Sequence, residues 1–149
     1  MNKFLFFLAL VLMVALPSWA AEEAGLIKVA KGVVNIERNS QKMAATAGMP
    51  VFAGDRVTTG DDGSVGITLR DNTLLSAGPK SALVLNRFAF DSATHAGAID
   101  ASLKRGTLSV VSGKIAKNSP SAVQFRTPAA ILGVRGTEFV IDASSAKEE

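Results

Sequence analysis

Short apolar segments separated by glycine-containing turns run through most of this sequence. Gly60-Asp61-Asp62-Gly63 and Gly78-Pro79-Lys80-Ser81 are two of these turns, and comparable signals recur about every 8–12 residues. Gly, Pro, Asp and Asn favour turns because they adopt left-handed backbone angles or fix the φ angle that a turn needs. This spacing leaves no room for long helices. The sequence therefore predicts an all-β sandwich or β-roll.

The segments between the turns have the residue pattern of strands. Ser64–Leu69 alternates polar and apolar residues, which is the period of a half-buried strand. Other strands are expected at 26–29, 33–36, 51–57, 73–75, 82–90, 99–104, 107–111, 123–127 and 138–141. We predict one compact domain over residues 21–143, with about 10 short and mostly antiparallel strands. A disordered tail is expected at 144–149, and 26–29 is expected to form a hairpin with 33–36 across Lys31-Gly32.

The first twenty residues have the pattern of a secretory signal. A basic start at Met1-Asn2-Lys3 precedes an uncharged apolar run from Phe4 to Leu16, and the small residues Ser18 and Ala20 follow. This order defines a signal peptide, so we expect a signal-peptide helix at 1–20 and cleavage after Ala20. The alternative is an uncleaved anchor, and contact with the membrane is expected only in that case. The predicted location is the periplasm.

Charge and cysteine content exclude several classes of protein. Removing residues 1–20 takes away one lysine and no acid, so Lys plus Arg falls from 16 to 15 against 13 Asp plus Glu, and the formal net charge falls from +3 to +2. The longest basic cluster is Lys104-Arg105, which is too little for a nucleic-acid binder. The chain has no cysteine, which excludes disulfides, thiol chemistry and Cys-ligated zinc.

Several weak motifs, in order, cover residues 25–142. They are Gly48-x-x-Val51-x-x-Gly54-Asp55-x-Val57-x-Thr59-Gly60-x-x-Gly63, Asp71-Asn72-Thr73-x-Leu75, Gly78-Pro79-x-Ser81, Leu103-x-x-Gly106-x-Leu108, Phe125-x-Thr127-Pro128-x-Ala130 and Arg135-Gly136-Thr137-x-Phe139. In order and spacing the sequence resembles the FecR domain family. The resemblance implies a periplasmic all-β module, which in the best-known members relays the state of an outer-membrane receptor to a cytoplasmic sigma factor.

This sequence departs from the signalling members at both ends. Only Met1-Asn2-Lys3 precede the apolar run, so we expect no cytoplasmic anti-sigma domain, and we expect no secretin-like domain after Ile141. What the resemblance implies for this chain is therefore a stand-alone periplasmic module that binds or scaffolds a partner.

The residues that could carry catalysis or bind a metal ion are few. His95 is the only histidine and lies in a polar loop without a carboxylate motif to orient it, so no general base is predicted. Asp61-Asp62 and Asp71-Asn72 could supply oxygen ligands to Ca²⁺, but Asp and Asn are also the residues that turns require. We expect no enzyme activity, no cofactor and no metal site.

The candidate site residues are Asp55, Arg135, Gly136, Thr137 and Phe139. Arg135 lies among apolar residues, and a buried guanidinium needs partners because an unpaired buried charge is costly. Asp55 is the candidate partner of Arg135, which would stabilise the fold. The alternative is that Arg135 contacts a binding partner directly.

The preferred function is non-enzymatic binding or scaffolding of another envelope component, protein or glycan. A partner strand could add to an exposed sheet edge, and Phe88, Phe90 and Phe125 are candidates for an apolar contact surface or for the core. Two alternatives are a sensor or regulator in signal transduction through a separately encoded membrane partner, and a small-molecule or Ca²⁺-binding periplasmic protein.

Overall fold

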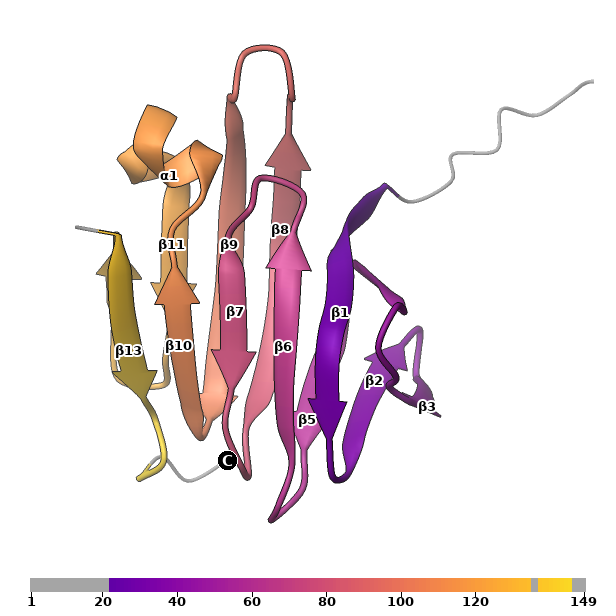
Figure 1. The fold of residues 1–149 in the computed structure, drawn as a ribbon. Helices are drawn as coiled ribbons and strands as arrows, with labels where there is room; N and C mark the ends of the chain where they lie inside the picture. Colours follow the sequence, from indigo (N-terminus) through magenta and orange to yellow (C-terminus); the bar gives the residue numbers. More distant parts are fainter. Residues whose placement is uncertain (1–21, 135–136, 146–149) are drawn as a thin grey trace, which may run out of the picture.

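The computed structural model describes residues 22–134 and 137–145, which form two packed β-sheets (Figure 1). The predicted signal helix at 1–20 and most of the predicted tail lie outside the described residues. Among the residues that the structure describes, no helix is long and apolar enough to span a bilayer.

One sheet has six strands in the order β13-β10-β7-β6-β1-β4. Its members are β13 (Glu138–Asp142), β10 (Thr107–Val111), β7 (Leu74–Ala77), β6 (Ser64–Leu69), β1 (Glu23–Lys31) and β4 (Pro50–Phe52). All its pairs are antiparallel. In the view of Figure 1 it is the nearer sheet.

The other sheet has seven strands in the order β12-β11-β9-β8-β5-β2-β3. Its members are β12 (Ile131–Gly133), β11 (Val123–Arg126), β9 (Gly97–Arg105), β8 (Ala82–Phe90), β5 (Arg56–Thr59), β2 (Val34–Arg38) and β3 (Gln41–Ala44). The pair β9 and β11 is parallel, and the other described pairs are antiparallel. Between β10 and β11 the chain forms a short helix, α1 (Lys114–Asn118), and a 3₁₀ turn, Pro120–Ala122.

These sheets confirm the predicted all-β sandwich. The described residues form thirteen strands rather than about ten. The short strands β3 and β12 were not expected, and the single strand expected at 51–57 is wrong, because the chain turns at Gly54 and its two halves, β4 and β5, lie in different sheets. The short helix α1 was also not predicted.

The predicted hairpin across Lys31-Gly32 is wrong. β1 pairs with β4 and β6 in one sheet, whereas β2 pairs with β3 and β5 in the other. Gly32 has φ +63°, and here the chain crosses from one sheet to the other. The crossing places the apolar sides of β1 and β2 in the same core, with Ile27 and Ile36 fully buried. The two last predicted strands, β11 and β13, likewise lie in different sheets.

The core lies between the sheets and is filled by the inward residues of each strand. β6 has the burial pattern of its sequence alternation, with Val65, Ile67 and Leu69 buried. Phe125 is the largest fully buried side chain, and its ring meets the ring of Phe139 from the facing sheet edge to face, with centroids 5.6 Å apart. The outward residues of both sheets are thereby left free to form two separate surfaces.

Candidate functional site

Asp55, a candidate site residue, lies in the loop before β5 and is 1% exposed. Arg38 at the end of β2 donates Nε–H to Asp55 Oδ1 (2.8 Å) and Nη2–H to Asp55 Oδ2 (2.7 Å). The Phe52 N–H also donates to Oδ2, and the Arg38 guanidinium lies 4.5 Å from the centre of the Phe52 ring. The hydrogen bonds to Asp55 raise the pKa of Arg38, against a smaller opposing effect of burial. Asp55 therefore links β2 to the loop after β4, which belongs to the facing sheet.

Arg38 was not singled out in the sequence, because it lies at the end of a strand with no motif around it. Arg135 and Gly136 lie outside the described residues, so the predicted contact between Arg135 and Asp55 stays a prediction. Thr137 is exposed, and its carbonyl accepts a hydrogen bond from the Ser112 N–H (2.7 Å). Phe139 is half-buried in β13. Thr137 and Phe139 thus belong to the six-stranded side of the sandwich, whereas Asp55 precedes a strand of the other sheet.

Asp71 is fully buried in the turn between β6 and β7. Its carboxylate accepts hydrogen bonds from the Thr73 N–H (3.1 Å), the Thr73 hydroxyl (2.8 Å) and the Ile115 N–H (3.2 Å). Its carbonyl accepts from the Lys114 N–H. Asp71 therefore holds the beginning of α1, although it lies more than forty residues earlier in the sequence.

The structure does not bring the aspartates of the possible Ca²⁺ site together. Asp61 and Asp62 are exposed in the turn before β6. Asp71 is buried in the turn after β6, at the opposite end of that strand. Each pair occupies a turn, which matches the requirement of turns for Asp and Asn. Within the described residues, no three His, Cys, Asp or Glu side chains are grouped to hold a metal ion. His95 is exposed, and its ring stacks on Phe90 with centroids 6.2 Å apart.

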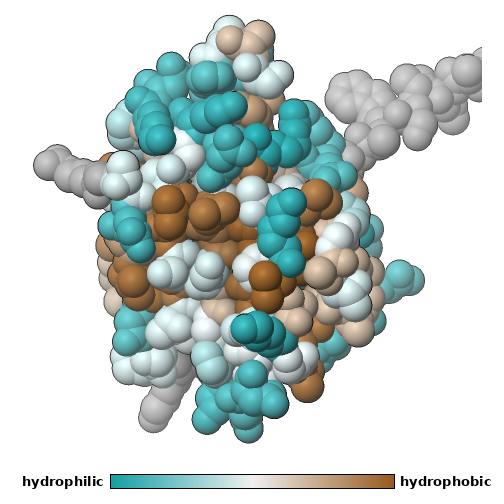
Figure 2. Space-filling view, viewed as in Figure 1, coloured by the Kyte–Doolittle hydropathy of each residue, from teal (hydrophilic) through white to brown (hydrophobic). Residues whose placement is uncertain are grey.

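The outer face of the six-stranded sheet is apolar or small over its middle strands. The strand register places Val111 beside Leu74, and Val140, Ser109 and Ser76 side by side in the next row. The exposed fractions are 68% for Val140, 42% for Leu74 and 36% for Val111. β10, β7 and β6 contain no charged residue at all. Figure 2 shows apolar areas across the middle of this face, while hydrophilic residues gather mostly at the strand ends.

The outer face of the seven-stranded sheet has a polar cluster on β8, β9 and β11. Arg126 donates from Nε and Nη2 to the carboxylate of Asp100 (3.0–3.2 Å), and Nη2 also donates to Gln124 Oε1 (3.3 Å). The Asn86 side-chain amide donates to Asp100 Oδ1 (3.2 Å) and to the Ser102 hydroxyl (2.7 Å). The bond from Arg126 holds the pKa of Asp100 below its usual range, while desolvation opposes this and Asn86 supports it.

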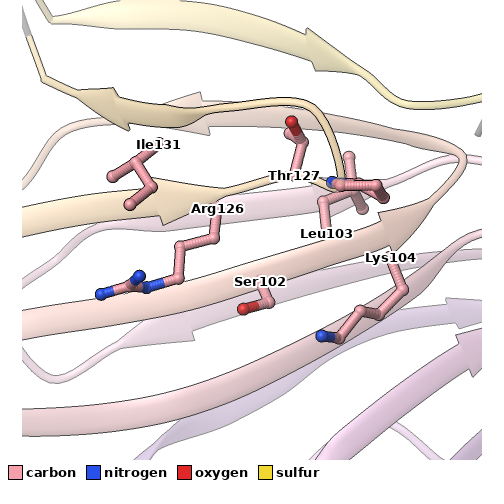
Figure 3. A pocket seen from close by; sticks show the side chains of 7 residues that line it. Ser102, Leu103, Lys104, Arg126, Thr127 and Ile131 are labelled. Carbon is pink, nitrogen blue, oxygen red and sulfur yellow. The ribbon is translucent and has the colours of Figure 1, made fainter.

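A groove of about 310 Å³ lies beside this cluster. Its lining residues come from β9, the end of β11 and the following turn and strand: Ser102, Leu103, Lys104, Arg126, Thr127, Pro128 and Ile131. Figure 3 shows Arg126 and Lys104 on the two sides of Ser102, with Ile131 above. Lys104 makes no ion pair with any described residue. The groove therefore combines two cations, two hydroxyl groups and an apolar wall.

Comparison with protein families shows to which family the chain belongs. A family model described as FecR protein matches residues 55–149, from Asp55 through β5 and beyond. The chain belongs to the FecR protein family. This confirms the resemblance found in the sequence, and membership fits an envelope-associated role.

Other comparisons add one similar structure. A chain described as a cell surface anchoring domain is 34% identical, with a TM-score of 0.39, over 41% of this chain and 82% of that chain. A search of curated protein sequences finds no match.

The motifs that resemble FecR domains hold the turns of this structure. Besides Asp55 and Asp71, the Ser81 hydroxyl donates to the Thr107 carbonyl (3.3 Å) and accepts from the Thr107 N–H (3.1 Å). A Cβ on Gly106, which has φ +86°, would collide with Ser81. The described motif residues thus maintain the turns of the FecR fold, and they do not lie on the two outer faces of the sandwich. Neither face was predicted, because strand order decides which outward residues become neighbours.

Proposed function

We propose that this FecR-family chain is an exported, non-enzymatic module that binds a protein of the cell envelope through the outer face of its six-stranded sheet. The observation that carries the proposal is the uncharged surface over β10, β7 and β6, flanked by the exposed Val140 and Val29. Contiguous exposed apolar area on a folded domain marks interaction surfaces. The N-terminal signal pattern supports a periplasmic location.

The edge strand β13 widens this surface. It pairs with β10 over five residues and has no second neighbour among the described strands. Its backbone groups on the free side are therefore available to a partner strand, the manner of binding expected from the sequence. Val140 projects from this edge strand beside Ser109 with an exposed fraction of 68%. The exposed Glu138 and Asp142 flank it on the same strand, so the edge of the surface is acidic.

A lysine placed on this face tests the proposal. The variants Leu74→Lys and Val140→Lys are compared with Val33→Lys, which makes the same kind of change at a residue that is 59% exposed between β1 and β2, off the sheet face. The immobilised proteins are used to capture components of an envelope fraction, and captured proteins are quantified by mass spectrometry.

We expect a protein that the wild type and Val33→Lys capture equally and that both face variants capture at least ~10-fold less, because a desolvated lysine opposes apolar contact. Circular dichroism should show similar melting temperatures, since exposed substitutions usually change stability by about 0.5 kcal/mol or less. Equal capture by all four proteins, or no captured protein, contradicts the proposal.

A further inference from the structure

The free edge of β13 presents a defined set of backbone groups. At the end of the β10–β13 pair, the Ala143 N–H donates to the Gly106 carbonyl (2.8 Å), so the backbone of Ala143 faces β10. In an antiparallel pair, every second residue of a strand directs its N–H and C=O groups to the same side. Glu138, Val140 and Asp142 therefore direct theirs to the free side, away from β10.

The side chains of the same three residues lie on the outer face of the sheet. Glu138, Val140 and Asp142 are exposed, whereas Ile141 points into the core and is buried. The two acids are four residues apart, which is about 13 Å along a strand, too far for their carboxylates to share one cation. The edge therefore presents an exposed valine between two separate negative charges.

No described cation neutralises these two acids. Their neighbours on β10 are uncharged, and the ion pairs that the structure describes involve other acids. The basic residues Arg105 and Lys114 lie beyond the two ends of β10. The pKa of Asp142 is lowered chiefly by the hydroxyl of Ser144 and further by its N–H, which are neutral donors. Within the described part of the chain, both charges are thus open to a partner.

Like charges oppose the pairing of this edge with a second copy of itself. In an antiparallel pair centred on Val140, each Glu138 would lie opposite Asp142 of the other copy. Like charges directly opposite each other destabilise a strand pair, whereas opposite charges stabilise it. The edge is therefore open in its backbone and selective in its charge, because it opposes its own copy and favours a strand with basic residues at those two positions.

We infer that β13 binds an extended segment of another envelope protein in which basic residues lie two positions before and two positions after an apolar residue. The segment adds to the six-stranded sheet beside β13. Its basic side chains pair with Glu138 and Asp142, and its apolar side chain lies beside Val140. The pattern is symmetric about the apolar residue, so it fits in either strand direction. The inference rests on the proposed function and adds the chemistry of the partner.

Two synthetic peptides test the inference on the purified full chain. One is acetyl-Gly-Lys-Thr-Val-Thr-Lys-Gly-amide, and the other has glutamate in place of both lysines. We expect the lysine peptide to bind at least ~10-fold more tightly, as measured by amide NMR shifts. It should slow hydrogen exchange at Glu138, Val140 and Asp142, whose N–H groups gain acceptors. Exchange at Phe139 and Ile141 should not change, because their backbone groups face β10.

A charge-reversed variant locates the contact. The double variant Glu138→Lys/Asp142→Lys should reverse the preference and bind the glutamate peptide more tightly. Glu37→Lys, at an exposed acid on β2 of the other sheet, is the matched control and should keep the preference of the wild type. Circular dichroism should show similar melting temperatures for all of these proteins, because the changed side chains are exposed.

Glu138→Lys alone should make the edge complementary to its own copy. In the antiparallel pair each new lysine then lies opposite Asp142 of the other copy, so this variant should self-associate more strongly than the wild type and the double variant. Analytical ultracentrifugation at low salt measures this, and added salt should weaken the association.

Several outcomes would overturn the inference. Absence of binding would mean that the acids only keep the edge unpaired. Equal binding of the two peptides, unchanged exchange at Val140, an unchanged preference in the double variant or unchanged association of Glu138→Lys would each contradict it. Capture from the envelope fraction uses neither peptide. Capture without peptide binding overturns this inference alone, and peptide binding without capture overturns the proposed function alone.

Discussion

The outer face of the six-stranded sheet and that of the seven-stranded sheet cover the same core and are built from strands of the same alternation. On the first, the middle strands β10, β7 and β6 have no charged residue. On the second, the middle strands place Asp100, Lys104 and Arg126 on the surface. One face can form apolar contact with a protein, while the other has fixed charges beside a groove.

The difference shows which positions of this fold are free to vary. The alternation of each strand requires only that one side be apolar, so the outward side can be apolar, small or charged without loss of the core. The FecR motif residues keep the turns in place on both sheets, and the outward positions then differ freely.

The largest expected effect comes from disrupting the core that lies beneath both outer faces. Phe125 is buried between the sheets and packs on Phe139, so Phe125→Ala should lower the free energy of unfolding by about 3–5 kcal/mol. The measurement is urea denaturation followed by circular dichroism, because the only tryptophan is Trp19 and there is no tyrosine.

In Phe125→Ala, amide hydrogen exchange should be faster than in the wild type in both β10 and β9, because the two sheets unfold as one cooperative unit. Faster exchange confined to one sheet would show instead that the faces are independent. Val140→Ala, an exposed change on the same strand as Phe139, is the control and should have little effect.

A smaller effect is expected at the connection between the two sheets. Asp71→Ala leaves the Ile115 and Thr73 donors without their acceptor in a buried position, which should cost about 3 kcal/mol. Asp71→Asn keeps one acceptor oxygen and should cost less. The measurement is urea denaturation together with hydrogen exchange at Ile115. Unchanged exchange at Ile115 in Asp71→Ala would show that this carboxylate does not hold α1.

The smallest effect should come from Asp100 on the outer face of the seven-stranded sheet, and it should depend on pH. The pKa of Asp100 is lowered from 3.8 in the folded protein, chiefly by Arg126. The ionised carboxylate therefore contributes stability above its unfolded pKa, and this contribution is lost as the pH falls through the lower folded pKa. Asp100→Asn should accordingly be slightly less stable than the wild type near neutral pH.

The two proteins should converge in stability at an acid pH well below 3.8, where the carboxyl group is protonated in the folded and in the unfolded protein. Urea denaturation at both pH values measures this, and Glu37→Gln on β2 of the same face is the matched control. A difference that is the same at both pH values would mean that the Asp100→Asn change acts through packing rather than through charge.

Part of the fold follows from particular residues in the sequence. The alternation of Ser64–Leu69 predicts β6 with its buried residues, and Gly60–Gly63 predicts the turn before it. The crossing at Gly32 could not be predicted, because a glycine with positive φ serves a hairpin and a change of sheet equally. The parallel pairing of β11 with β9 also depends on α1 and the 3₁₀ turn between β10 and β11, which give no periodic pattern in the sequence.

The candidate sites were less predictable than the fold. The sequence predicted that Asp55 pairs with an arginine and named Arg135. The described partner is Arg38, which lies seventeen residues before Asp55 and is brought to it by the packing of β2. Ser102, Lys104 and Arg126 have no motif in common. They meet because β9 and β11 are neighbours and because β11 is the shorter strand.

The sequence by itself determined that this chain is an all-β member of the FecR family, because alternation and turn residues are local properties that each segment expresses without reference to the others. Only the tertiary structure decided which strands share a sheet, which partner Asp55 has, and that the middle strands of one outer face are uncharged while those of the other carry charges. Those features depend on pairs of residues far apart in the chain. Their proximity results from burying all the apolar strand sides in one core, and no single segment encodes it.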